Sequence, residues 1–177
     1  MRFEKLEQNI IDMIKEEQAK LGYRKESIRL YYPLSSLVHL TGADLGEQEM
    51  LDLLSEFGEE TKEHLGGVAV TAKKERFCFL IPEEGVVYVK EHTSPNEFIH
   101  DLVDLVGRHD CTMDEIKALF EKQPWPVTVE PVNNEEFDIL IRFGEGADDP
   151  YYYCFKDEGC HIIYHRFLPE DYADFDF

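Results

Sequence analysis

The chain has 177 residues and a formal net charge of −20, because 38 aspartates and glutamates outnumber 18 lysines and arginines. A hydrophobic content of 43% is enough to bury a core, which excludes a disordered chain and fits one domain or two small ones. This acidity repels phosphate backbones and anionic lipids, so nucleic acid is not an expected partner unless a locally basic surface exists. No apolar tract approaches the roughly 20 residues of a membrane span, and the charged N-terminus is unlike a signal peptide. We therefore expect a cytoplasmic protein without a membrane partner.

The first half of the chain shows the element order of a winged helix. Apolar residues at helical spacing predict a helix over residues 3–21, and Pro33 and Gly42 mark the start and end of a second helix. A third helix is expected over residues 46–65, with one apolar face and one nearly all acidic face. The strands are a short one over 28–32, a hairpin over 68–81 with a charged turn at Lys73–Arg76, and a further strand over 85–90. The sequence thus predicts an α+β fold with a winged-helix-like N-terminal half of helices plus a β-hairpin.

A boundary is expected at His92–Pro95, which divides the chain into two regions, residues 1–92 and residues 93–177. Beyond it, Pro95 begins one helix, and the capping-box pair Thr112 and Glu115 begins another. A small antiparallel sheet should follow this helix pair, with strands over 127–130, 137–143, 151–156 and 160–167 and with Phe137, Ile139, Ile141 and Phe143 on one core face. The tail that starts at Pro169 mixes acids with aromatics and is expected to be loosely held unless a partner orders it.

Positive charge gathers in two short stretches. The candidate anion contacts are Arg24, Lys25 and Arg29 around the first strand, and Lys73, Lys74 and Arg76 in the hairpin turn. Tyrosines beside the first stretch would suit single-stranded nucleic acid. The alternative is a helix end whose cations favour the negative pole of the helix dipole. We favour the alternative, because Glu26 interrupts the first stretch and the rest of the chain is acidic.

No catalytic, cofactor or metal motif rises above chance. The four cysteines form no CxxC pair, so we expect reduced thiols and no metal site. Glu97 and His100 have the ExxH spacing of di-iron proteins, but the second pair that such a site requires is missing. No phosphate-binding loop or dinucleotide fingerprint is present, so no cofactor is expected. A ligand or enzymatic pocket at the C-terminal sheet stays open as an alternative, with polar groups from His100, Asp138, His161 and His165.

The opening stretch LEQNIIDMIKEEQAKLGYRKESIRLYYPLSSL resembles the start of an uncharacterised family of small bacterial proteins, known as a domain of unknown function. The likeness is strongest over residues 4–40. The resemblance implies a bacterial, cytoplasmic protein of similar length. It implies no activity, substrate, cofactor or site residue.

The function we expect is that of a non-enzymatic protein-interaction or regulatory module. Clustered aromatics supply interface hot spots, so the candidate contact residues are Trp125, Tyr151, Tyr152, Tyr153, Tyr172 and Phe175. For the tyrosine run, the alternative is an ordinary edge strand with one buried face. The acidic face of the third helix is a second candidate surface, for a basic partner, and the alternative is that this face only keeps the protein soluble. A homodimer through an exposed sheet edge and nucleic-acid binding through the hairpin are the remaining options.

Overall fold

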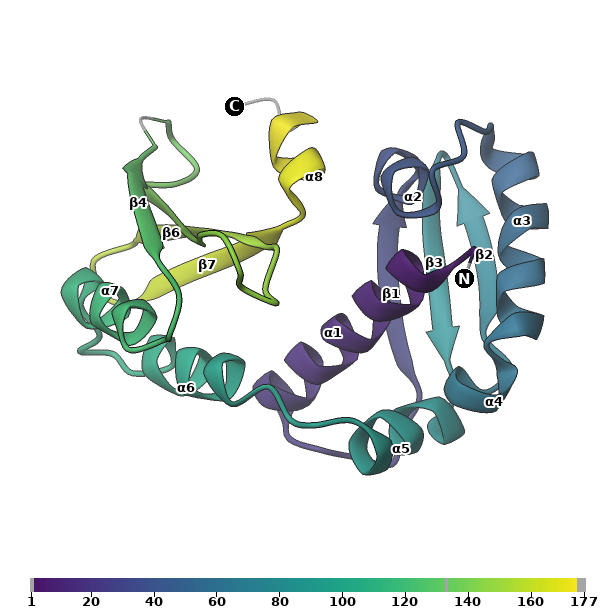
Figure 1. The fold of residues 1–177 in the computed structure, drawn as a ribbon, viewed down its shortest axis with the longest axis horizontal. Coiled ribbons are helices and arrows are strands. Elements are labelled where there is room, and N and C mark those ends of the chain that lie inside the picture. The colour runs from purple at the N-terminus through teal and green to yellow at the C-terminus, as the bar shows by residue number, and fades with distance from the viewer. Residues whose placement is uncertain (1, 133, 175–177) are drawn as a thin grey trace. The chain divides into compact units, whose positions relative to one another are not determined.

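Residues 2–132 and 134–174 are described by a computed structural model, shown as a ribbon in Figure 1. The chain divides into an N-terminal unit, Met1–Glu97, and a C-terminal unit, Phe98–Phe177. Each unit combines helices with an antiparallel sheet, which confirms the predicted α+β class. The division into a winged-helix-like region over residues 1–92 and a second region over residues 93–177 stays a prediction.

The N-terminal unit follows the predicted order up to its hairpin. Its elements are α1 (Glu4–Leu21), β1 (Ile28–Pro33), α2 (Leu34–Thr41), α3 (Glu47–Glu60), α4 (Lys62–Leu65), β2 (Ala69–Lys73), β3 (Arg76–Ile81) and α5 (Glu83–His92). The three strands form one antiparallel sheet in the order β1-β3-β2. Figure 1 shows α1 in front of this sheet and α3 beside β2. The left-handed conformation of Gly42 ends α2 as predicted, and its amide donates to the carbonyl of Val38.

One face of this sheet packs against the helices. The rings of Phe57 on α3 and Phe79 on β3 have centroids 6.4 Å apart, and both side chains are fully buried. On β1, the hydroxyl of Tyr32 donates a hydrogen bond of 2.7 Å to the amide oxygen of Asn9 on α1. Each buried phenylalanine of this kind contributes about 2–3 kcal/mol by leaving water. Strands and helices therefore share one core, on one side of the sheet only.

The prediction of a strand over residues 85–90 is wrong, because these residues belong to α5. Gly85, Val86 and Val89 are the buried residues of α5, which is a helical spacing and not a period of two. A side chain at Gly85 would lie 2.2 Å from the carbonyl oxygen of Leu65, so the close packing of α4 on α5 requires glycine here. Tertiary packing thus overrides the strand preference of the valines.

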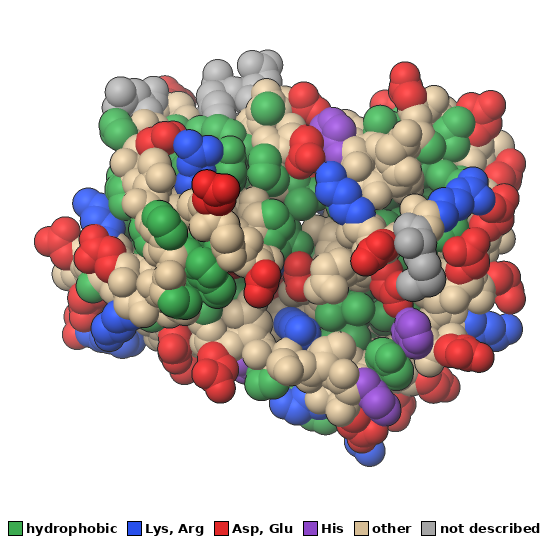
Figure 2. All heavy atoms as spheres, viewed as in Figure 1, with side chains coloured by type: hydrophobic (Ala, Val, Ile, Leu, Met, Phe, Trp, Pro, Cys, Tyr) green, Lys and Arg blue, Asp and Glu red, His purple; other side chains and the backbone are tan. Residues whose placement is uncertain are grey.

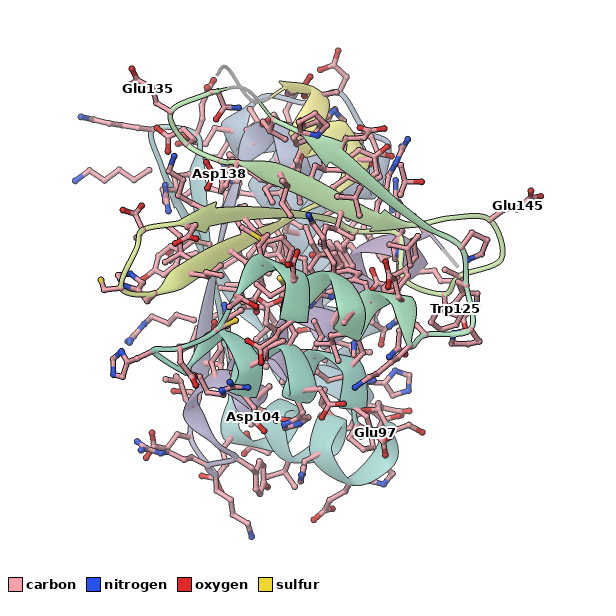
Figure 3. All side chains as sticks on the ribbon, turned by 90° about the vertical axis from the view of Figure 1, so that its left-hand side faces the viewer. Glu97, Asp104, Trp125, Glu135, Asp138 and Glu145 are labelled. Carbon is pink, nitrogen blue, oxygen red and sulfur yellow. The ribbon has the colours of Figure 1, made fainter. Side chains whose placement is uncertain are left out.

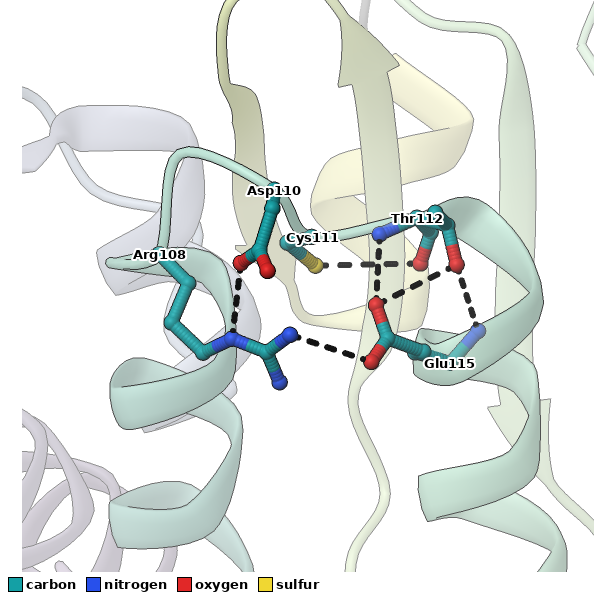
Figure 4. Close-up of polar contacts among 5 residues, drawn as sticks. All are labelled: Arg108, Asp110, Cys111, Thr112 and Glu115. Atoms are coloured by element: carbon teal, nitrogen blue, oxygen red, sulfur yellow. Dashed lines mark hydrogen bonds and ion pairs between the residues drawn. The ribbon is translucent and has the colours of Figure 1, made fainter.

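The C-terminal unit is a helix pair followed by a meander. Its elements are α6 (Glu97–Val106), α7 (Met113–Glu121), β4 (Val127–Pro131), β5 (Ile139–Phe143), β6 (Tyr152–Asp157), β7 (Ile162–Phe167) and α8 (Pro169–Asp174). The strands pair antiparallel in the order β4-β5-β6-β7. Thr112 begins α7 with the predicted capping box: its hydroxyl accepts from the amide of Glu115, and its own amide donates to the Glu115 carboxylate. Figure 4 shows that the guanidinium of Arg108 forms ion pairs with the carboxylates of Asp110 and Glu115, next to this capping box.

Both faces of the second sheet are covered. On one face, Phe98 of α6 and Phe120 of α7 pack on Phe143 and Tyr153, with ring centroids 5.1 to 5.8 Å apart. The opposite face holds a cluster of Phe137, Leu140, Cys154 and Phe167, with Tyr172 of α8 packed against it. Burial raises the pKa of the Cys154 thiol to about 12.

This second cluster corrects two expectations. Phe137 does not share a face with Ile139, because the chain turns before β5 begins. The side-chain oxygen of Asn134 accepts hydrogen bonds from the backbone amides of Glu136 and Phe137 and stabilises this turn. The tail is not loosely held as far as Asp174, because α8 packs its Tyr172 ring 5.4 Å from that of Tyr152.

Candidate functional site

The candidate site is the side of the β1-β3-β2 sheet that turns away from the helices, which we call the outer face. Alternate residues of a strand point to opposite faces, so the buried Leu30, Tyr32, Phe77, Phe79 and Ile81 define the inner face. The strand register then places three rows on the outer face: Arg29, Leu80 and Ala69; Tyr31, Cys78 and Thr71; Pro33, Arg76 and Lys73. None of these residues is acidic, and three are cations.

The outer face combines exposed apolar surface with positive charge. Tyr31 is 56% exposed, and the guanidinium of Arg76 lies 5.7 Å from the centre of its ring. Cys78 and Leu80 are half-buried beside it, whereas Arg29 and Lys73 are exposed. Elsewhere the molecule is acidic: Figure 2 shows red acidic side chains spread over the side that it draws, with blue basic ones scattered among them. The outer face therefore differs in charge from the rest of the chain.

Two hollows lie at the two ends of β1. The hollow at the Arg29 end has a volume of about 240 Å³, and Arg24, Glu26 and the 68% exposed Leu21 also line it. The hollow at the Pro33 end has a volume of about 630 Å³, and its lining includes the start of α2, the cations Lys74 and Arg76 and the acids Asp44 and Glu75. Tyr31 lies on β1 between the two ends.

The hairpin turn holds its cations in a constrained position. Lys74 and Glu75 have φ angles of 53° and 59°, the left-handed conformation that a two-residue turn requires and that L-residues adopt at a cost of roughly 1–2 kcal/mol each. Two hydrogen bonds offset this conformational cost. The carbonyl of Glu75 accepts a hydrogen bond of 2.8 Å from the amide of Leu34, and the amide of Glu75 donates to the carboxylate of Glu47. The turn is thereby fixed to the starts of α2 and α3.

The structure brings together part of the predicted anion-contact set. Arg29, Lys73 and Arg76 share the outer face, although 44 residues separate Arg29 from Lys73 in the sequence (73 − 29). Lys74 lies at the hairpin tip, and Arg24 and Lys25 lie in the loop before β1. Sequence reasoning missed Tyr31, Cys78 and Thr71 as the middle of this surface. The alternation of residues along β1 could have indicated that Tyr31 is exposed. Only the strand register shows which residues of β3 and β2 lie beside it.

The predicted aromatic contact residues are mostly packed inside the C-terminal unit. Tyr151 is 3% exposed under the guanidinium of Arg166, 4.0 Å from the ring centre. Tyr153 is fully buried, and its hydroxyl donates to Asp149 at 2.6 Å. These two rings are therefore core residues. The strand β6 lies between β5 and β7, so it is not the edge strand of the alternative.

Three other aromatic candidates, Trp125, Tyr152 and Tyr172, are half-buried. Tyr152 accepts a hydrogen bond of 2.7 Å from Arg142 and packs against Tyr172. Trp125 lies in the loop between α7 and β4, with its ring 5.6 Å from that of Phe143. Phe175 lies outside the described residues.

The alternative pocket residues do not converge. Figure 3 shows Asp138 at the opposite end of the sheet from Trp125, where it accepts from Lys156 and from the amide of Asp157. These hydrogen bonds, the amide of Asp157 first, hold the pKa of Asp138 below its ordinary value. His100 is exposed on α6, His161 contacts Cys160 in the β6–β7 turn, and the His165 ring lies 4.2 Å from that of Phe167.

Residues 2–132 and 134–174 contain neither a candidate metal-binding group nor a candidate membrane-spanning helix. Within these ranges, no three His, Cys, Asp or Glu side chains are grouped closely enough to hold a metal ion. None of the helices in the described part of the chain has both the length and the apolar character that crossing a bilayer takes.

Taken together, the two units define a small α+β protein whose distinguishing surface is an acid-free sheet face. A family model described as "Domain of unknown function, E. rectale Gene description (DUF3877)" matches residues 3–175. The chain therefore belongs to this family, which confirms the resemblance to a domain of unknown function and extends it beyond the opening stretch. The description names E. rectale, a bacterium. No curated protein and no solved structure matches the chain.

Proposed function

We propose that the chain is a non-enzymatic protein-interaction module and that its contact surface is the outer face of the β1-β3-β2 sheet. The observation that carries this proposal is the composition of that face, which has three cations, an exposed Tyr31 and no acid in a chain of net charge −20. An exposed aromatic ring beside arginine is the composition of an interface hot spot. Four free thiols favour a reducing compartment, which supports a cytoplasmic location.

A winged-helix-like N-terminal unit is part of this proposal. The order α1-β1-α2-α3-β2-β3 and the strand order β1-β3-β2 both support it. A fold of this kind does not fix a function, because winged helices serve both DNA binding and protein contacts. The function must come from the surface.

Duplex DNA is not the partner that this surface favours. A winged helix that binds DNA places the second helix of its pair, here α3, in the major groove. The exposed side of α3 carries Glu49, Asp52, Glu56 and Glu59. Within a Debye length of about 8 Å these carboxylates would repel phosphates, where lysines would release counterions.

A twofold dimer through the outer face is disfavoured as well. Such a contact repeats the same patch on both subunits, so it would bring Arg29, Lys73 and Arg76 against the same cations of a second copy. A homodimer would therefore use another surface, such as a sheet edge.

The test is capture of partners from a native bacterial lysate by the tagged full chain at low and at moderate salt. A chain with Tyr31→Ala and Arg76→Ala should lose the specific partner that the unchanged protein retains. A matched control with Tyr88→Ala and Lys62→Ala, which removes a half-buried tyrosine and an exposed cation elsewhere in the same unit, should retain it. Equal capture by both variants contradicts the proposal, and so does the absence of any specific partner.

A further inference from the structure

Arg29, Tyr31 and Arg76 follow one another along the outer face of the sheet. Arg29 lies in the row at one end, Tyr31 in the middle row, and Arg76, paired with Pro33, in the row at the other end. We propose that this line binds an extended acidic segment of a partner protein, in which two carboxylate side chains flank an apolar or aromatic residue. The inference rests on the proposed protein-interaction function and names the chemistry of the partner.

The spacing of the cations sets the spacing of the carboxylates. Arg29 and Pro33 are four residues apart on β1, which is about 13 Å at about 3.3 Å per residue. Arg76 lies opposite Pro33 on the neighbouring strand. An extended peptide covers the same length in four residues, and its alternate side chains point to one side. The matching pattern is therefore an acid, any residue, an apolar residue, any residue, and an acid.

The middle of the line accepts an apolar group. Tyr31 is 56% exposed, and Cys78 and Leu80 beside it are half-buried and uncharged. The Arg76 guanidinium lies 5.7 Å from the centre of the Tyr31 ring, a cation–π contact that favours this ring position while more than half of the side chain stays exposed. The two arginines suit carboxylates, because a guanidinium can donate two parallel hydrogen bonds to one carboxylate.

The surroundings favour a short acidic peptide over a nucleic acid. Each hollow beyond the outer face is lined by acids as well as cations: Glu17 and Glu26 at the Arg29 end, and Asp44 and Glu75 at the other end. A strand of nucleic acid that continued past either end would bring phosphates to these carboxylates, within the screening distance of about 8 Å. A five-residue segment whose two carboxylates bind Arg29 and Arg76 on the outer face ends before the hollows.

Three labelled peptides test the chemistry directly. The first has the central sequence Glu-Thr-Phe-Thr-Glu between Gly-Ser flanks with blocked ends, the second replaces both glutamates with glutamine, and the third has the order Glu-Glu-Phe-Thr-Thr. Binding to the full chain is measured by fluorescence anisotropy at 50 and 200 mM salt. The first peptide should bind at least tenfold more tightly than the second and at least threefold more tightly than the third. Its affinity should fall as salt rises.

Protein variants locate the contact. Combining Arg29→Ala with Arg76→Ala should weaken binding of the first peptide at least tenfold. The control combines Lys5→Ala with Lys62→Ala, which removes the same charge from exposed positions on α1 and α4 of the same unit and should leave binding unchanged. Thermal melting of each variant confirms that the fold is retained.

The outcomes separate this inference from the proposed function. Equal binding of all three peptides, or of both double variants, overturns the inference. Tighter binding of a labelled eight-residue oligouridylate than of the first peptide overturns it in favour of nucleic acid. If no peptide binds while the lysate partner is still lost in the Tyr31→Ala and Arg76→Ala chain, the acidic chemistry is wrong and the interaction function stands.

Discussion

Tyr31 on β1 lies directly opposite Cys78 on β3, in the middle row of the outer face. The inner neighbours of this pair are core residues, since the rings of Tyr32 and Phe79 have centroids 5.2 Å apart. A rigid core therefore supports the middle of the proposed contact surface from behind. Because Cys78 is half-buried next to the exposed Tyr31, its thiol also serves as a reporter of whether this surface is covered.

Substitution of Gly85 should test the packing of α5. An added Cβ at Gly85 would lie 2.2 Å from the Leu65 carbonyl oxygen, so Gly85→Ala should lower the free energy of unfolding by about 1–3 kcal/mol, as overpacking does. Gly67→Ala is the matched control, since a Cβ at Gly67 meets no atom within 4 Å. Urea denaturation of both variants measures the difference. Equal stability of the two would contradict the helix packing described.

Phe57 should be among the most sensitive positions of the N-terminal unit. It is fully buried, with ring contacts to Phe3 and Phe79. Phe57→Ala should cost about 3–5 kcal/mol, through lost burial and the cavity left behind. The control Leu21→Ala removes a large apolar side chain that is 68% exposed and should change stability by less than about 0.5 kcal/mol. A small effect at Phe57 in thermal or urea unfolding would mean that this core is not the one described.

The carboxyl group of Asp138 should make stability fall on the acid side. The Asp157 amide, and after it Lys156, keeps its pKa below the ordinary value in the folded state. A depressed pKa means that the stabilisation is complete above the unfolded-state pKa of about 3.9 and is lost as pH falls through the folded-state value. Asp138→Asn should therefore be less stable than the unchanged protein at pH 7, with the difference shrinking below pH 4. A difference that does not change between pH 7 and pH 3 would show that the charge of Asp138 is not involved.

The boundary between the units should be the first site of proteolysis. Residues 93–96 link α5 to α6 outside any helix or strand, and Ser94 and Pro95 are exposed. Limited digestion with a protease of broad specificity should cut here first and release two fragments that resist further digestion, as independent regions would. Simultaneous loss of both halves without stable fragments would show that the units fold only together.

The sequence was sufficient where local signals decide the structure. Pro33 and Gly42 mark the limits of α2, Thr112 and Glu115 begin α7, and the alternation around Lys73–Arg76 identifies the hairpin. It was insufficient where tertiary contacts decide. The valines of α5 favour a strand by themselves, but the approach of Gly85 to Leu65 selects the helix.

The site was predictable only in part, for a related reason. The cations of the outer face were named from the sequence, but the register that places Arg29, Lys73 and Arg76 on one face is a long-range property. The burial of Tyr151 and Tyr153 likewise depends on contacts outside their own run, with Arg166 and Asp149. A cluster of aromatics in the sequence does not distinguish a contact surface from a core.

The most direct test of the proposed contact surface is the rate at which Cys78 reacts with N-ethylmaleimide at pH 8, with and without the captured partner, read by peptide mass spectrometry. Cys160 is exposed in the C-terminal unit and serves as the reference, whereas the buried Cys154, with a pKa raised to about 12, should stay unmodified throughout. The account predicts that the partner slows alkylation of Cys78 at least fivefold and leaves Cys160 unchanged. An unchanged rate at Cys78 in the bound protein would contradict the assignment of the outer face as the contact surface.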